Sequence, residues 1–99
     1  MKSLSIAQTN DLLRKTLSGC RVMMTAGVAD SEDQAQILAA VKSFHKFTED
    51  NDPYGEHDFA FFEVNGEKFF FKFDYYDSNY EFFQEDGNRV LTIGRADEY

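Results

Sequence analysis

The chain is poor in the residues that mark secreted, linker and membrane-spanning proteins. Its single cysteine, Cys20, cannot form an internal disulfide, and a lone cysteine is typical of a reducing compartment. One proline and six glycines exclude a proline-rich or glycine-rich linker. No apolar run approaches the roughly 20 residues that span a bilayer, and Met1-Lys2-Ser3 leads into a polar segment rather than a signal peptide. We therefore expect a cytoplasmic protein.

Positive charge is also scarce, and the net charge is −8. Residues 1–48 carry six Lys and Arg against four acids, whereas residues 49–99 carry four against fourteen, which gives +2 and −10. A negative field of this size repels nucleic-acid phosphates and attracts basic protein surfaces. Direct nucleic-acid binding is therefore not expected, although an acidic surface can also serve solubility alone.

Aromatic residues are abundant, although tryptophan is absent. Eleven Phe and five Tyr bring the aromatic fraction to 16% in a chain of 99 residues that is 42% hydrophobic. This composition is too apolar for a disordered acidic tail, and the length suits a single domain spanning residues 1–99. A domain of this size buries one modest core, which leaves little room for an enclosed active site.

The N-terminal half predicts a helix followed by a strand. Residues 5–18 show helical apolar spacing, with Ser5 and Gln8 at capping-box positions and Gly19 as the stop. Residues 21–28 alternate in the manner of a strand, and apolar side chains on both of its faces favour an inner position in the sheet.

A second helix is predicted over residues 31–48. Ser31 and Gln34 have capping-box spacing, and the acids around them suit the positive end of the helix dipole. One apolar stripe follows at helical intervals, formed by Ile37, Ala40, Val41, Phe44 and Phe47.

The pair Asn65-Gly66 lies between two aromatic runs and predicts a two-residue hairpin turn. The turn sets Val64 opposite Glu67, and the strands then pair outward from it. One face becomes the core, with Ala60, Phe62, Val64, Phe69, Phe71, Phe73 and Tyr75. The other face carries an aromatic stripe, Phe59, Phe61 and Phe70, that could form a homodimer interface.

The remaining chain predicts a loop over residues 78–87, a last strand over 89–95 and a charged tail over 96–99. The element order is then α-β-α-β-β-β. This order predicts an α+β fold with one antiparallel sheet of about four strands and two helices packed on one face.

Residues 50–58 hold the densest set of polar side chains, and three interpretations compete for them. Their oxygen ligands could hold a divalent metal, although two ligands of a calcium loop are missing. A small metal-dependent enzyme could use Asp52, Glu56, His57 and Asp58, although no nucleophile accompanies His57. We favour a structural loop without metal, cofactor or catalytic residue. Its members are Asp50, Asp52, Pro53, Gly55, Glu56, His57 and Asp58.

A second acidic cluster interleaves tyrosines with carboxylates, a mixture typical of protein-binding surfaces. An ordinary solvated edge is the competing interpretation. The predicted partner-binding residues are Asp74, Tyr75, Tyr76, Asp77, Tyr80, Glu81, Glu85 and Asp86.

Blocks of sequence along nearly the whole chain resemble a family of small proteobacterial proteins of unknown function, often encoded on mobile elements. The blocks are residues 10–14, 22–28, 50–59, 72–77, 89–93 and 98–99, and DNDPYGEHDF at 50–59 is the most specific. The resemblance supplies no enzyme class. By analogy with other small acidic proteins of mobile elements, it implies an inhibitor of host defence.

Composition and resemblance together predict a non-enzymatic binding protein. We expect its partner to be a basic protein surface, for example that of a CRISPR effector subunit, which an anti-CRISPR-like protein could occupy as a DNA mimic. The alternative is the small metal-dependent enzyme that uses residues 50–58.

Overall fold

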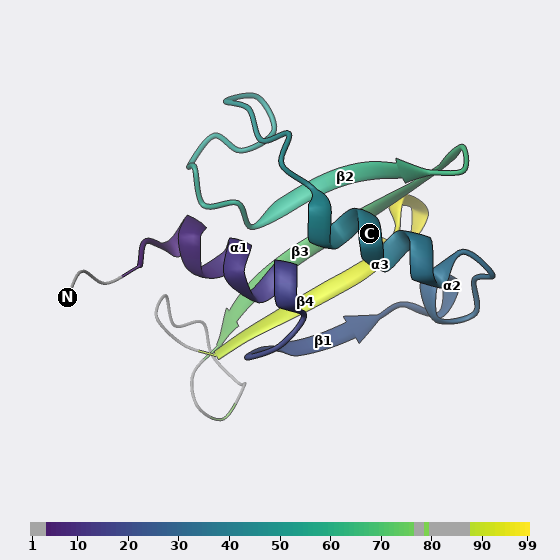
Figure 1. The fold of residues 1–99 in the computed structure, drawn as a ribbon, viewed down its shortest axis with the longest axis horizontal. Helices are drawn as coiled ribbons and strands as arrows, with labels where there is room; N and C mark the ends of the chain where they lie inside the picture. The colour runs from purple at the N-terminus through teal and green to yellow at the C-terminus, as the bar shows by residue number, and fades with distance from the viewer. Residues whose placement is uncertain (1–3, 77–78, 80–87) are drawn as a thin grey trace.

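Helices from the first half of the chain pack on a sheet built mainly from the second half. The computed structural model describes residues 4–76, 79 and 88–99, so the loop predicted at 78–87 lies, apart from Asn79, outside the described residues. Figure 1 shows the elements, which are α1 (Ile6–Thr16), β1 (Arg21–Met24), α2 (Ala26–Ala29), α3 (Gln34–Ser43), β2 (Phe59–Val64), β3 (Glu67–Tyr76), β4 (Asn88–Arg95) and the 3₁₀ turn η1 (Ala96–Glu98). Across the described ranges, no helix has the length and apolarity to cross a membrane.

The sheet is mixed, with the strand order β1-β4-β3-β2. The predicted α+β class with four strands is confirmed, and β2, β3 and β4 pair antiparallel. The purely antiparallel arrangement is wrong, because β1 pairs parallel to β4. The predicted inner position of β1 is also wrong, since β1 is an edge strand. Apolar side chains alternate on both faces of β1, but three of its four residues are exposed, so this pattern does not require an inner position.

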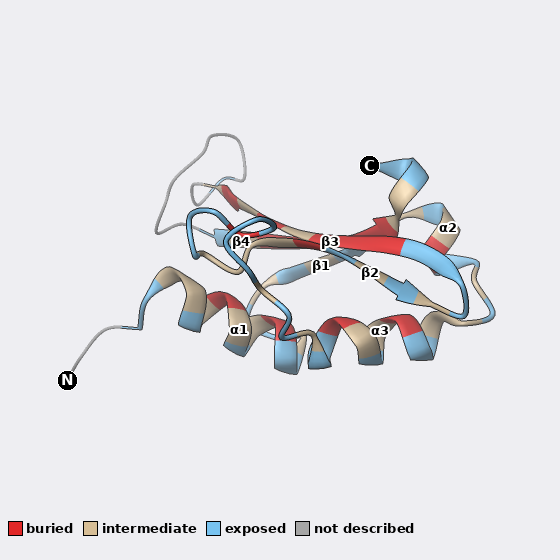
Figure 2. Cartoon of the chain, turned by 90° about the horizontal axis from the view of Figure 1, so that it is seen from above, coloured by how far each residue is buried: buried red, intermediate tan, exposed pale blue. Residues whose placement is uncertain are grey.

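The two longer helices cover one face of the sheet (Figure 2). The predicted hairpin register is confirmed at every pair from Val64 with Glu67 to Phe59 with Lys72. The predicted core face of the hairpin packs beneath the helices. The buried cluster consists of Val28, Ile37, Val41, Ala60, Phe69, Phe71, Phe73, Tyr75, Leu91 and Ile93.

The N-terminal helix begins as predicted. The Ser5 hydroxyl accepts a hydrogen bond from the Gln8 N–H at 3.1 Å, and the Gln8 side chain accepts one from the Ser5 N–H at 2.9 Å. The helix ends before Gly19, at Leu17, which takes the left-handed conformation itself with φ 52°.

The second helical region differs from its prediction at both ends. Residues 26–28, predicted to end a strand, belong to α2, and α3 spans only Gln34–Ser43. The predicted Ser31–Gln34 capping box is wrong, because the Gln34 amide donates instead to the Ala29 carbonyl at 3.0 Å and so ties α3 to α2. Phe44 already has extended backbone, and its ring packs edge-on against Phe71 at 5.5 Å.

Candidate functional site

The loop over residues 50–58 is organised around one buried carboxylate. Asp52 is 8% exposed, and its Oδ1 accepts hydrogen bonds from the N–H groups of Glu56 at 3.2 Å and His57 at 3.3 Å. Gly55 and His57 both have positive φ, at 63° and 54°, so the chain turns sharply around this carboxylate. The carboxylate therefore replaces the backbone acceptors that an irregular turn lacks.

The His57 ring joins this loop to α1. Its Nδ1 lies 2.9 Å from Oδ2 of Asp11, and its Nε2 lies 3.7 Å from Oδ2 of Asp52. One ring face stacks on Phe47, with centroids 4.0 Å apart and planes 2° from parallel. A carboxylate near each nitrogen and an aromatic ring on one face fix the orientation of the imidazole.

Arg14 continues the network into the core. Its guanidinium donates to the Val41 carbonyl at 2.6 Å and to Asp11 at 2.8 Å, and it lies over the rings of Phe47 and Phe71. Partial burial acts to raise the pKa of the Asp11 carboxyl, but the hydrogen bonds from Arg14 and His57 outweigh it and hold that pKa below its ordinary value.

Asn10 forms a second set of hydrogen bonds, which joins α1 to the loop over residues 50–58 and to the sheet. Its amide donates to the Glu56 carbonyl at 3.0 Å and to the Tyr75 hydroxyl at 2.8 Å, and its Oδ1 accepts from Arg89 at 2.8 Å. Burial raises the pKa of Tyr75 to about 12. Tyr75 is only 8% exposed and belongs to the core face, so its place in the predicted partner-binding set is corrected.

The side chains of Asp52 and His57 are thus engaged with the fold itself. Burial, with Asp52 and Asp74 nearby, raises the pKa of the Asp58 carboxyl despite a hydrogen bond from its own backbone. Within the described part of the chain, no three His, Cys, Asp or Glu side chains converge in a metal-binding group. The structural interpretation of residues 50–58 stays a prediction, and the contacts of Asp52 and His57 favour it.

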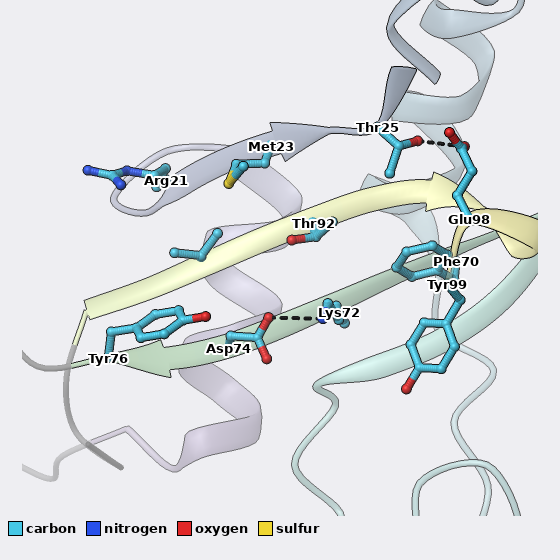
Figure 3. Close-up of a pocket in the computed structure, with 11 residues that line it drawn as sticks. Arg21, Met23, Thr25, Phe70, Lys72, Asp74, Tyr76, Thr92, Glu98 and Tyr99 are labelled. Atoms are coloured by element: carbon cyan, nitrogen blue, oxygen red, sulfur yellow. Dashed lines mark hydrogen bonds and ion pairs between the residues drawn. The ribbon is translucent and has the colours of Figure 1, made fainter. Parts of the chain in front are cut away.

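A surface depression lies on the opposite face of the sheet. This sheet hollow has a volume of about 520 Å³ and opens to solvent (Figure 3). Side chains from β1, β3, β4 and the C-terminal turn line it, namely Arg21, Met23, Thr25, Phe70, Lys72, Asp74, Tyr76, Val90, Thr92, Glu98 and Tyr99. The volume falls within the roughly 300–1,000 Å³ of small ligand sites.

Strand register explains which side chains meet in the hollow. Met23 lies beside Thr92, and Thr92 lies beside Lys72 on the next strand. In the adjoining row Val90 is flanked by Asp74, whose carboxylate is 3.3 Å from the Lys72 ammonium. The hollow therefore presents an apolar floor with paired charges, and Tyr76 lies at its end on β3.

The C-terminal residues close one end of the hollow. The Tyr99 ring contacts all three members of the aromatic stripe, at 5.1 Å from Phe59, 6.1 Å from Phe61 and 5.1 Å from Phe70. Phe70 is consequently only 2% exposed, whereas Phe61 keeps 41%. The stripe is therefore partly covered by the chain's own C-terminus.

Glu98 fastens this turn to the start of α2. Its carboxylate accepts hydrogen bonds from the Thr25 hydroxyl at 2.7 Å, the Gly27 N–H at 3.0 Å and the Arg95 N–H at 2.9 Å. The bond from Thr25, followed by those from the two amides, lowers the pKa of Glu98. A Cβ at Gly27 would collide with the Arg95 and Glu98 side chains, so a larger residue there would require these side chains to move.

The predicted partner-binding residues do not all lie on one described surface. Asp74 and Tyr76 line the hollow, and Tyr75 points to the core. Asp77, Tyr80, Glu81, Glu85 and Asp86 lie outside the described residues.

Sequence reasoning missed both the polar network and the hollow. The spacing of Asp11 and Arg14 on one helix was a usable signal, because residues three apart face each other. No local pattern connected Asn10 to Arg89, which are 79 positions apart.

Comparison with known proteins gives a family but no activity. The chain belongs to the family described as "Protein of unknown function (DUF3768)", whose model matches residues 24–98. No curated protein and no solved structure matches the chain. The family match agrees with the resemblance to proteins of unknown function, and it begins after α1, so Asn10, Asp11 and Arg14 lie outside the matched range.

Proposed function

We propose that this protein acts by binding a basic surface of a partner protein and catalyses no reaction. The observation that carries the proposal is the contrast between the two polar regions. Asp52 and His57 are engaged by internal contacts, whereas the sheet hollow is open and lined by charged and aromatic side chains. Such a mixture of aromatic and polar groups is typical of protein-binding surfaces.

Charge supports a basic partner. Residues 49–99 carry a net charge of −10, and Asp74 and Tyr76 at the hollow lead directly into the acidic residues 77–86. A surface of this charge accelerates encounters with basic proteins and disfavours nucleic acid as a direct ligand.

The finer form of the proposal is inhibition of a complex that binds nucleic acid. The carboxylates at 74, 77, 81, 85 and 86 would occupy the sites that phosphates otherwise fill, in the manner of a DNA mimic. The resemblance to mobile-element proteins favours a host defence complex, such as a CRISPR effector, as the target of this anti-CRISPR-like protein.

Affinity capture of partner proteins from a nuclease-treated proteobacterial lysate, with this protein as the bait, tests the proposal. The test variant reverses Asp74, Asp77, Glu81 and Glu85 to Lys, and the matched control reverses four exposed acids elsewhere, Asp30, Glu32, Glu49 and Asp50. We expect the control to retain the captured protein and the test variant to lose it. Equal retention by both variants would refute the assigned surface, and capture of nucleic acid alone would refute a protein partner.

A further inference from the structure

At residues 22–24, the outer side of β1 pairs with no second strand among the described residues. β1 lies at the margin of the sheet, and no labelled element lies beyond it in Figure 1. Exposed edges invite pairing, and proteins usually protect them with charges, proline or bulges. Residues 22–24 are Val-Met-Met and contain none of these protections, and Met23 and Met24 are 52% and 40% exposed.

The pairing of β1 with β4 determines which backbone N–H and C=O groups of β1 face away from the sheet. The Thr25 N–H donates to the Ile93 carbonyl on β4 at 3.0 Å. Because successive residues of a strand direct these groups to opposite sides, Met23 also faces β4, and the N–H and C=O groups of Val22 and Met24 face outward.

The charge distribution indicates which kind of partner can pair with this strand edge. Residues 12–29 form an acid-free segment with Arg14, Lys15 and Arg21, so all eighteen carboxylates of the chain lie outside it. Two copies of a protein with net charge −8 repel each other over most of their surfaces. Among the described residues, β1 itself carries no carboxylate, and Glu98 near its end is already engaged by Thr25 of its own copy at 2.7 Å.

We propose that two copies of this chain pair antiparallel along β1 about a twofold axis through Met23. Residues directly opposite each other in such a pair point to the same face of the sheet. Centring on Met23 sets Val22 opposite Met24 of the second copy, so the outward-facing groups form hydrogen-bonded pairs. Arg21 falls opposite Thr25, and no like charges are opposed. The two sheets become one continuous sheet, with the helices of both copies on the same side.

The pairing also extends the sheet hollow. Arg21 and Met23 form its boundary on β1, and the axis places Met23 of the second copy directly beside that boundary. Each hollow then receives a wall from the other copy, and the two hollows face solvent as one trough. This inference does not rest on the proposed partner.

The other candidate dimer surfaces are less suitable. β2 is the second edge strand, but Asp58, Glu63 and Glu67 lie in or beside it, so pairing β2 with itself brings acids together. The aromatic stripe, predicted from sequence as a homodimer surface, is contacted by Tyr99, and Phe70 is buried there.

Disulfide trapping in a Cys20→Ser background tests the register. Met23→Cys places two thiols across the axis at a non-hydrogen-bonded pair, with Cα atoms about 4.5 Å apart, which is inside the usual disulfide range. Leu12→Cys is the matched control, because Leu12 is also 52% exposed and lies in the acid-free segment. Phe61→Cys reports on the aromatic stripe. We expect mild oxidation to cross-link Met23→Cys at least about tenfold faster than either control, since pairing raises the local thiol concentration.

Light scattering supplies a second measurement that needs no oxidation. We expect the mass of the Cys20→Ser chain to rise from 11.4 kDa towards twice that value between about 1 µM and 1 mM, the range of a small interface. Met24→Pro removes an outward N–H, leaves the β1–β4 bonds intact and should keep the chain monomeric. A single-chain mass throughout, equal cross-linking at 12 and 23, or preferential cross-linking at 61 would each overturn the proposal.

Discussion

Among the described residues, Arg14 and Asp52 are the two charged side chains that the fold buries most completely, at 1% and 8% exposure. Burying a charge costs free energy unless partners replace its water. Asp11 and the Val41 carbonyl do so for Arg14, and two backbone N–H groups do so for Asp52. His57 lies between Asp11 and Asp52, so Asp11 and His57 together connect the two buried charges.

Replacing Asp52 by Ala should lower the free energy of unfolding by about 1–3 kcal/mol, because two backbone N–H groups lose their acceptor. Asp50→Ala is the matched control, since Asp50 is exposed in the same loop and its loss should change stability by less than about 0.5 kcal/mol. Urea unfolding measures both. Equal effects of the two substitutions would show that the Asp52 contacts do not hold the loop.

The carboxyls of Asp11 and Asp58 should affect stability with opposite signs as pH changes. The pKa of Asp58 is raised in the folded state, so its ionised form opposes folding above that pKa. Asp58→Asn should therefore stabilise the protein at pH 7 and lose this effect near pH 3, where the carboxyl is protonated in both states.

Asp11 has a lowered pKa, so it contributes stability above its unfolded pKa of about 3.9 and loses it as pH falls through the folded pKa. Asp11→Asn should therefore destabilise at pH 7, with a smaller effect in acid. Thermal unfolding from pH 3 to pH 7 measures both variants. The same sign for both at pH 7 would contradict the assigned environments.

At the scale of elements, Arg14 joins two helices through the end of α3. Its guanidinium donates to the carbonyls of Val41 and Lys42, which lie in the last turn of that helix and have no partner within it. A cation there also suits the negative end of the helix dipole. The contact sets where α3 ends relative to α1.

Arg14→Met should lower the free energy of unfolding by about 2–4 kcal/mol, because the α3 carbonyls and Asp11 lose their donor. Lys15→Met removes the same charge from the next, exposed position and should have little effect. Chemical unfolding compares the pair. A loss shared equally by both variants would point to net charge rather than to the helix contact.

Gly94 permits a close crossing of β4 by an aromatic ring. A Cβ at this position would lie 2.6 Å from the Phe70 ring and 2.7 Å from the Thr25 methyl. Gly94→Ala should therefore destabilise by about 1–3 kcal/mol. The cost should shrink in a Phe70→Leu background, and a double-mutant cycle measures this coupling. If the two substitutions instead changed stability additively, the added Cβ would collide with a group other than the Phe70 ring.

The elements also show why sequence predicted some features and not others. The hairpin was predictable because Asn65-Gly66 fixes its register locally. The parallel pairing of β1 with β4 was not, since it joins segments about 70 positions apart and leaves no local pattern. The end of α3 depends on Arg14, a residue of another helix, so periodicity alone extended the helix too far.

At the scale of the whole molecule, α1 and α3 occupy one face of the sheet and the C-terminal turn lies on the other side (Figure 2). The sheet hollow lies on the face that α1 and α3 leave open. The acid-rich second half was visible in the sequence, and so were Asp74 and Tyr76 as surface candidates. The contributions of Arg21, Met23 and Tyr99 to the hollow were not visible, because they depend on strand order and on the path of the chain after β4.

We propose that the acidic residues from Asp74 to Asp86 bind a basic protein. The most direct test of this claim is the affinity for the captured partner, purified free of nucleic acid, measured at increasing salt. Because screening weakens attraction between exposed charges, we expect the dissociation constant to rise at least about tenfold between roughly 50 and 300 mM NaCl. We expect the variant reversed at Asp74, Asp77, Glu81 and Glu85 to show no binding at either salt concentration. An affinity that is independent of salt and unchanged in that variant would contradict the claim.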